Sequence, residues 1–314
     1  MNSIVLLNTA NLSREKWLES RRVGIGGSDA AAVCGLNPWK SALSVYMEKL
    51  GAAPERDDTE AMRQGRDLED YVASRFEEAT GKRTERVNAI LQHPDYPWMV
   101  ANIDRRVVGE VAGAECKTTA AWNEKEFDEE IPLAYQLQCF HYMAVTGADY
   151  WYLPVLFLNK AFKVYLIERD EPTIEKLIEI EAAFWERVQA QEPPDPDGSQ
   201  DYTDMLKARY SSDNGAQIDL MDVKEHDMER LAHLKEDIKA ITAQAKQIEQ
   251  RIQAELGEAG AVEGWRGDWR ARWSTVVSNR VDTARLKEKY PRVYRDCIKP
   301  SQSRRFTVAR KERD

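Results

Sequence analysis

Residues 102–117 read NIDRRVVGEVAGAECK, and this stretch decides the fold. Asp104 is followed eleven residues later by Glu115-Cys116-Lys117. Residues two apart in a strand project from the same face, so Glu115 and Lys117 point together. Asp104 lies on the neighbouring strand and reaches the same end. The stretch therefore predicts paired strands that bring two carboxylates and one lysine to a single place.

Two carboxylates at ligand distance suit Mg²⁺, which prefers one or two carboxylates together with water and phosphate oxygens. An adjacent lysine can lower the pKa of an attacking water or stabilise a charged transition state. Phosphodiester cleavage needs these parts. Charged residues on an exposed hairpin give the same pattern by chance, but the flanking Val107, Val108 and Ala114 predict a half-buried position.

Helix and strand patterns alternate on both sides of this stretch, from residue 1 to about residue 200. A helix is predicted over 59–80, where Leu68, Val72 and Phe76 recur at four-residue spacing. A second is predicted over 132–147, with proline at its start and glycine at its end. Strands are predicted at 89–91, 98–101, 107–108, 114–117, 150–158 and 162–167, and further helices at 13–21 and 172–191. The fold class is α/β (α+β), with a central mixed sheet flanked by helices.

Residues 193–198, PPDPDG, form a stiff polar linker and predict a domain boundary. The expected domains are a catalytic domain over 1–198, a long-helix segment over 199–260 that packs on this core, and a basic α+β extension over 261–314. The helix predicted over 223–256 carries apolar residues at alternating spacings of three and four, a seam typical of packing on its own chain or of a coiled coil.

Charge is distributed unevenly. The net charge of −9 alone disfavours binding to nucleic acid, but residues 263–314 hold 15 Lys and Arg against 7 Asp and Glu, which leaves −17 on the rest. In this tail, Trp265, Trp269 and Trp273 interleave with arginines that include Arg304 and Arg305, which favours contact with DNA or a partner protein. Alternatively, strand alternation places all three tryptophans on one face, where they pack a small core.

The cysteine spacing and the length of the apolar runs indicate the cellular compartment and its redox state. The four cysteines stand far apart with no Cys-x-x-Cys pair, which argues against a zinc ribbon, an iron–sulfur cluster and a disulfide scaffold. Apolar runs are too short to cross a bilayer, and the first residues do not read as a signal peptide. We therefore expect a cytoplasmic, reduced protein that does not engage membranes.

Three further features suit the same chemistry. Glu69 lies at the edge of its helix's apolar stripe, where an inward carboxylate needs a partner such as a metal ion; a surface position is the alternative. Gln138 and Tyr142 stand one helical turn apart and can orient water or phosphate. Arg22, together with Gly26-Gly27-Ser28 at a helix N-terminus, offers a guanidinium, N–H groups and a hydroxyl to an anion.

In their order along the chain, these residues resemble the YqaJ/lambda-exonuclease family of viral recombinases, within the wider PD-(D/E)xK nuclease superfamily. The resemblance covers about residues 14–190. The matching motifs are Arg22 with Gly26-Gly27-Ser28-Asp29, Gly65-Arg66-Asp67-Leu68-Glu69, Asn102-Ile103-Asp104, Glu115-Cys116-Lys117, and Gln138 with Tyr142.

The resemblance implies a metal site. Glu69, Asp104, Glu115 and the backbone carbonyl of Cys116 would bind Mg²⁺, with Mn²⁺ as a substitute. Ile103 replaces the proline of the superfamily name, but that proline is not a ligand.

It also implies roles for the remaining residues. Lys117 and Gln138 would assist the attacking water. Arg22 and Ser28 would hold the terminal 5′ phosphate, with Tyr142 among the residues that contact DNA.

The implied activity is 5′→3′ degradation of one strand of linear duplex DNA to 5′-mononucleotides. The remaining 3′ single strand would serve phage-type recombination in a bacterial cytoplasm. A ring-shaped homotrimer and a single-strand annealing protein as partner are further implications.

Two alternatives stay open. One is a RecB-like or restriction-type endonuclease, which the anion site at Arg22 and Ser28 disfavours. The other is a non-catalytic protein that binds DNA or a recombinase, which the intact set of Asp104, Glu115 and Lys117 disfavours.

Overall fold

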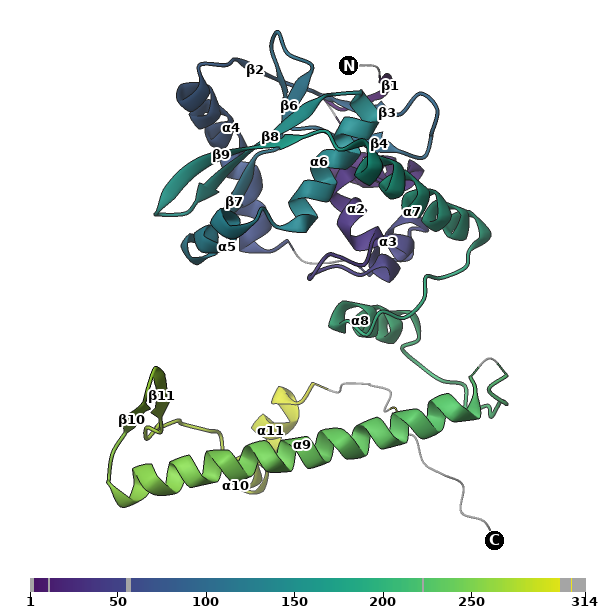
Figure 1. The fold of residues 1–314 in the computed structure, drawn as a ribbon. Helices are drawn as coiled ribbons and strands as arrows, with labels where there is room; N and C mark the ends of the chain where they lie inside the picture. Colours follow the sequence, from purple (N-terminus) through teal and green to yellow (C-terminus); the bar gives the residue numbers. More distant parts are fainter. Residues whose placement is uncertain (1–2, 11, 55–57, 222, 300–305, 307–314) are drawn as a thin grey trace. The chain divides into compact units, whose positions relative to one another are not determined.

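The computed structural model describes residues 3–10, 12–54, 58–221, 223–299 and 306. The chain divides into two compact units, Met1–Tyr210 and Ser211–Asp314. The expected fold, a central mixed sheet flanked by helices, is confirmed in the first unit (Figure 1). Within the described part of the chain, no helix combines the length and apolar character of a membrane-spanning segment.

The central sheet has six strands in the order β2-β5-β6-β8-β7, with β9 also paired to β8. β6 and β7 run parallel to β8, and the other pairs are antiparallel. Its strands are β2 (Thr84–Arg86), β5 (Arg105–Val107), β6 (Ala112–Ala114), β7 (Lys117–Thr119), β8 (Tyr150–Phe157) and β9 (Ala161–Glu168). A smaller antiparallel sheet joins β1 (Ile4–Asn8), β3 (Ala89–Gln92) and β4 (Val100–Ala101).

β6 and β7 are two halves of one interrupted strand. Ala114 of β6 pairs with Tyr152, and Lys117 of β7 pairs with Val155 three residues further along the same neighbour. The register is continuous across the gap, which holds Glu115 and Cys116.

Successive side chains of β8 point to opposite faces of the sheet. Both faces are apolar, and helices cover each of them. Tyr150 and Tyr152 lie on the face covered by α4 (Glu60–Thr80), where Phe76 packs with its ring centroid 5.1 Å from that of Tyr152. Trp151 and Leu153 lie on the other face, in the main core beneath α6 (Leu133–Thr146). α6 is buried over its last ten residues and is therefore held in a fixed position.

The remaining helices of the first unit position α6 and its surroundings. α2 and α7 pack on α6, and His141 of α6 lies 2.9 Å from the Oε1 atom of buried Glu181 on α7. These helices are α1 (Arg14–Ser20), the 3-10 helix η1 (Arg21–Val23), α2 (Gly27–Val33), α3 (Ala42–Lys49), the 3-10 helix η2 (Ala121–Asn123), α5 (Glu124–Glu129), α7 (Glu171–Ala190) and α8 (Gln200–Arg209).

The first unit continues past residue 198, where the sequence predicts a boundary, because α8 packs on α3. The carboxylate of Asp201 accepts hydrogen bonds from the Ser41 N–H at 2.7 Å and the Ser44 hydroxyl at 2.5 Å. Tyr202 and Met205 are buried in the same cluster. That the segment 199–260 packs on the core as a whole stays a prediction.

The second unit contains the long helix expected over 223–256, found as α9 (Glu225–Glu258). Its apolar seam is exposed, with Ile238 and Ile241 each 63% accessible. Beyond it lie the hairpin β10 (Glu263–Arg266) and β11 (Trp269–Arg272), then α10 (Thr283–Lys289) and α11 (Pro291–Cys297). The sequence also predicts a strand near 303–309, and of that range only Phe306 is among the described residues.

The alternative in which Trp265, Trp269 and Trp273 share one face of a single strand is wrong. A turn at Gly267, whose φ is 58°, separates β10 from β11. Trp265 pairs across the hairpin with Arg270, and Trp269 pairs with Arg266. Since directly paired residues share a face and neighbouring pairs alternate, Trp265 and Trp269 lie on opposite faces.

We expect Gly113→Ala to destabilise the first unit by about 1–3 kcal/mol, because an added methyl group overpacks the core. A Cβ at Gly113 would lie 2.2 Å from Cζ2 of buried Trp151. Urea denaturation measures the change. Gly65→Ala in α4 is the matched control: its nearest neighbour would be Thr118 Oγ1 at 3.8 Å. A helical alanine should raise stability by up to about 1 kcal/mol. Equal effects of the two variants would contradict this packing.

Candidate active site

The gap between β6 and β7 holds Glu115 in a fixed, buried position. Its N–H donates to the Tyr152 carbonyl at 3.0 Å, and only 4% of the residue is exposed. The carboxylate Oε1 accepts hydrogen bonds from Lys117 Nζ at 2.7 Å and Gln138 Nε2 at 2.6 Å. The other oxygen, Oε2, is buried and has no hydrogen-bond partner among the described residues. Such an oxygen is costly unless something else binds it.

Asp104, just before β5, is the second carboxylate of the site. Its Oδ2 accepts a hydrogen bond from the Cys116 N–H at 2.9 Å, which ties it to the interrupted strand. Burial and the nearby charge of Glu115 raise the pKa of Asp104 to about 7, against the lowering effect of Lys117. Burial also raises the pKa of the Cys116 thiol, which disfavours its nucleophilic thiolate form.

Lys117 bridges the carboxylates and α6. Its Nζ also donates to the Gln138 Oε1 at 3.0 Å and lies 5.4 Å from the centroid of the Tyr135 ring. Burial opposes the charged form, but the carboxylates of Glu115 and Asp104 raise the pKa of Lys117 above its ordinary value. Lys117 is therefore a cation in this arrangement and can stabilise negative charge.

Gln138 and Tyr142 come together one turn apart on α6, as their spacing suggests. Gln138 Nε2 donates to the Tyr142 hydroxyl at 2.8 Å, and that hydroxyl donates to the Asn102 carbonyl at 3.2 Å. The two side chains thus connect Glu115 to the backbone just before Asp104.

Glu69 approaches the cluster from α4, but its carboxylate is paired with arginine. Its Oε1 accepts from Arg105 Nη1 at 2.5 Å and lies 3.4 Å from Arg86. Burial and the charge of Asp104 raise the pKa of Glu69, although both arginines lower it. Arg105 is itself buried, and no spacing pattern in the sequence predicts its pairing with Glu69.

The donor set is compatible with a divalent ion of the hard, oxygen-binding kind. Within the described residues, no three His, Cys, Asp or Glu side chains are grouped closely enough to hold a metal ion. Two carboxylates, Asp104 and Glu115, do converge. The buried Oε2 atom of Glu115 accepts no hydrogen bond from the described part of the chain, and a bound cation would supply the missing interaction. Mg²⁺ requires no more than one or two carboxylates.

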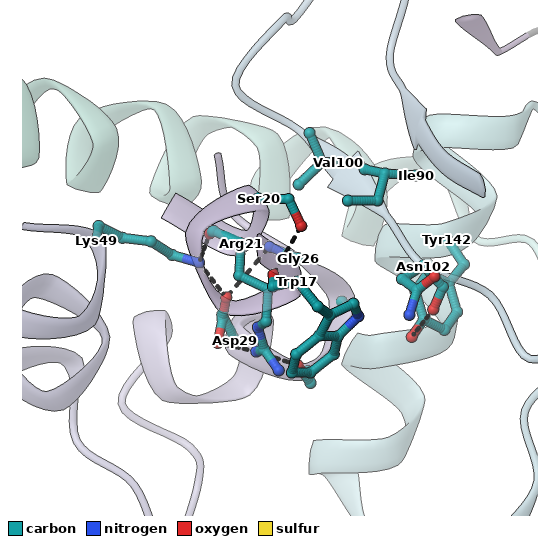
Figure 2. A pocket seen from close by; sticks show the side chains of 12 residues that line it. Trp17, Ser20, Arg21, Gly26, Asp29, Lys49, Ile90, Val100, Asn102 and Tyr142 are labelled. Atoms are coloured by element: carbon teal, nitrogen blue, oxygen red, sulfur yellow. Dashed lines mark hydrogen bonds and ion pairs between the residues drawn. The ribbon is translucent and has the colours of Figure 1, made fainter. Parts of the chain in front are cut away.

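A cavity of about 90 Å³ opens beside this cluster. Figure 2 shows Arg21, Asp29 and Lys49 on one side of it, and Asn102 and Tyr142 on the other. Tyr142 and Asn102 therefore belong both to the cavity wall and to the hydrogen-bond chain that reaches Glu115.

Cationic groups surround one buried carboxylate in this cavity. Burial raises the pKa of Asp29, but the charges of Lys40, Lys49 and Arg21 hold it well below its usual value. Lys49 Nζ lies 2.6 Å from Asp29 Oδ2, with its side chain 2% exposed. Among the residues that line the cavity, Arg21 and Lys49 are cationic and Asp29 is anionic, so the charged groups of the wall sum to a positive charge.

Arg21, and not the predicted Arg22, reaches Ser28. Arg21 Nη2 donates to the Ser28 hydroxyl at 3.0 Å, and its guanidinium lies 5.1 Å from the centroid of the Trp17 ring. The guanidinium of Arg22 lies beside Gly51, where an added Cβ would be 2.7 Å from Arg22 Nη1. Both arginines are in η1, where successive side chains point about 120° apart, and Arg21 lines the cavity whereas Arg22 is not among its lining residues.

Comparison with known proteins identifies the family. Residues 16–149 match the family model described as a YqaJ-like viral recombinase domain. The chain is 41% identical over 310 residues to the uncharacterized protein YqaJ of Bacillus subtilis (strain 168), covering 97% of both chains. The chain belongs to the YqaJ family.

A solved structure shares the fold. The structure of LHK-Exo in complex with dAMP is similar at a TM-score of 0.50 and 21% identity, covering 63% of this chain and 98% of that chain. LHK-Exo is an alkaline exonuclease from Laribacter hongkongensis, and a second crystal structure of it matches at a TM-score of 0.49 with 22% identity, covering 57% of this chain and 94% of that one.

We expect metal-free protein to lose stability as pH rises through about 7, and Asp104→Asn to lose less. The folded pKa of Asp104, about 7, lies above its ordinary value of 3.8. The stabilisation from the bound proton is thus complete below the unfolded pKa and lost as pH rises through the folded one. Urea denaturation in EDTA at about pH 5 and about pH 8 measures the difference.

Asp219→Asn, an exposed carboxylate of the second unit, is the control for this titration. It should show the same pH dependence as the wild type. If wild type and Asp104→Asn differ by the same free energy at both pH values, Asp104 is not protonated in the native state.

Proposed function

We propose that this YqaJ-family chain is a metal-dependent deoxyribonuclease that degrades one strand of linear duplex DNA from its 5′ end. The observation that carries the proposal is the convergence of Asp104, Glu115 and Lys117 beside a cationic cavity. Phosphodiester hydrolysis needs carboxylates to place a metal ion and a cation to stabilise charge on the phosphate. The fold shared with LHK-Exo is consistent with it.

Asp104, Glu115 and the Cys116 carbonyl would hold Mg²⁺, or Mn²⁺ in its place. When bound, the ion supplies Lewis-acid polarisation of the phosphate and lowers the pKa of water. Glu69 would join the ligands once its carboxylate separates from Arg105. The high pKa of Asp104 makes binding compete with protons, so affinity for the ion should rise with pH.

The side chains around Glu115 serve the hydrolysis. Water adds its oxygen to phosphorus, the bond from phosphorus to the 3′ oxygen breaks, and the water proton ends on that oxygen. Lys117 stays protonated and faces the charge that develops on the phosphate oxygens. Gln138 orients Glu115 through its 2.6 Å hydrogen bond and limits the positions of Lys117 from the other side.

The cavity at Arg21 and Ser28 favours attack from a DNA end over internal cutting. A terminal phosphate is a dianion that accepts charge-assisted hydrogen bonds from a guanidinium, and the Ser28 hydroxyl lies 3.0 Å from that guanidinium. Asn102 and Tyr142 connect the cavity to Glu115, so a nucleotide seated there presents its next phosphodiester to the carboxylates. The dAMP in the LHK-Exo complex is a nucleoside 5′-monophosphate, the product class of such a reaction.

The biological setting follows from the same proposal. Resection from 5′ ends leaves 3′ single strands, the substrate of a single-strand annealing protein in phage-type recombination. A ring-shaped homotrimer around the duplex remains the proposed assembly, since an acidic chain needs its cationic surfaces gathered along one path. A RecB-like or restriction-type endonuclease is the second candidate, and it would not need the cavity.

Glu115→Ala and Lys117→Ala should each lower the rate on linear duplex with Mg²⁺ by at least about a hundredfold, as loss of a charge-stabilising group does. Thermal unfolding should show both variants folded. Glu85→Ala is the control, since this exposed carboxylate pairs with Arg106 at the surface of β2. A rate near that of wild type in either active-site variant places the chemistry elsewhere.

Arg21→Ala should abolish any preference for a 5′ phosphate over a 5′ hydroxyl, because the charge-assisted contact is lost. The assay compares initial rates on the two ends of otherwise identical linear DNA. Arg22→Ala is the matched variant and should keep the preference. If Arg22→Ala abolishes it and Arg21→Ala does not, the residue carried over from the family resemblance is the phosphate ligand.

A further inference from the structure

The hairpin β10–β11 displays tryptophan and arginine side chains that no part of the proposed catalytic site uses. Trp265 is 66% exposed and Trp269 is 84% exposed. Large apolar side chains at such exposure point to a binding surface when they cluster with polar groups. Here they cluster with three arginines, Arg266, Arg270 and Arg272.

The hairpin is anchored at one end and free at the other. An added Cβ on Gly264 would lie 3.1 Å from Cδ2 of Leu256, the one residue of α9 that is buried. One on Gly257 would lie 3.5 Å from the Trp273 ring. These contacts hold the base of the hairpin on the end of α9, while the turn at Gly267 carries Trp269 into solvent.

Each exposed indole has an arginine opposite it. Arg270 pairs across the strands with Trp265, and its guanidinium carbon lies 5.5 Å from the centroid of that ring. Arg266 pairs in the same way across the strands with Trp269. The cross-strand pairing of a tryptophan with an arginine therefore occurs on both faces of the ribbon.

The charge around the hairpin is positive. Residues 259–299 hold ten Lys and Arg against five Asp and Glu, a net +5 on a chain whose total is −9. An anionic ligand is therefore favoured, and the exposed indoles further favour one with flat aromatic groups. Aromatic side chains with arginine stack on the faces of unpaired bases while cations neutralise the phosphates. In a duplex those faces are covered by neighbouring bases.

We infer that the hairpin β10–β11 is a binding site for single-stranded DNA, occupied by the 3′ strand that resection leaves. The choice of that strand rests on the proposed nuclease function, because degradation of one strand generates the other beside the enzyme. The hairpin takes no part in hydrolysis. It retains the product strand through stacking on Trp265 and Trp269.

Fluorescence anisotropy of a labelled oligothymidylate, with full-length protein in EDTA, tests the site without cleavage. Trp265→Ala/Trp269→Ala should weaken binding at least about tenfold, the loss of stacking on one to two bases. Trp265→Phe/Trp269→Phe keeps the aromatic faces and should stay close to wild type. Trp122→Ala, which removes an indole 80% exposed in the first unit, should bind as wild type does.

Salt dependence provides the second readout. Arg270→Ala should reduce the slope of log affinity against log salt by about 0.7, the value for one phosphate contact on a single strand. All variants should digest saturating linear duplex at the wild-type rate, so a failed nuclease assay in wild type counts against the proposed function alone. Wild-type affinity in the double alanine variant overturns the hairpin site. The hairpin site is also overturned if the double alanine variant keeps its DNA affinity but no longer binds an annealing protein, because the hairpin would then be a protein interface.

Discussion

The hydrogen bond from the Cys116 N–H to Asp104 is the constraint on which the rest of the site depends. This bond holds the Asp104 carboxylate beside the gap between β6 and β7. The same gap contains Glu115, whose N–H is fixed by its hydrogen bond to Tyr152. Burial and the repulsion between two carboxylates kept this close together raise the pKa of Asp104. Lys117 offsets part of that repulsion, and the two carboxylates in turn favour its charged form. A cation between the two carboxylates would remove the repulsion, so the geometry that costs stability without metal is what prepares the site to bind one.

The helix α6 transmits this constraint to the cavity. It is buried over ten consecutive residues, so its side chains have little freedom to move. Gln138 touches Glu115, and Tyr142, one turn later, forms part of the cavity wall beside Arg21. The spacing of one turn sets the distance between the cavity proposed to bind a DNA end and the carboxylates proposed to direct its cleavage. A rigid helix is suited to removing a fixed length of strand at each step.

Local periodicity was enough to predict much of this arrangement. Strand alternation brings Glu115 and Lys117 together, and helical spacing brings Gln138 and Tyr142 together. Periodicity does not predict which residue of a short helical turn faces the site, nor which residues far apart in the sequence pair with each other. Whether Arg21 or Arg22 faces the cavity depends on a single turn of 3-10 helix, and Glu69 is drawn to Arg105 across 36 residues. The tryptophans divided between two faces because Gly267 places a turn within an otherwise alternating pattern.

The most direct measurement follows the two strands of a linear duplex, each labelled at one end, beside a sealed circular plasmid, with Mg²⁺ and with EDTA. We predict that linear DNA is degraded from its 5′ ends to mononucleotides, that the 3′-ended strands persist, and that the circle and the EDTA samples remain intact. Cutting of the sealed circle, or removal of nucleotides from the 3′ ends, would contradict it.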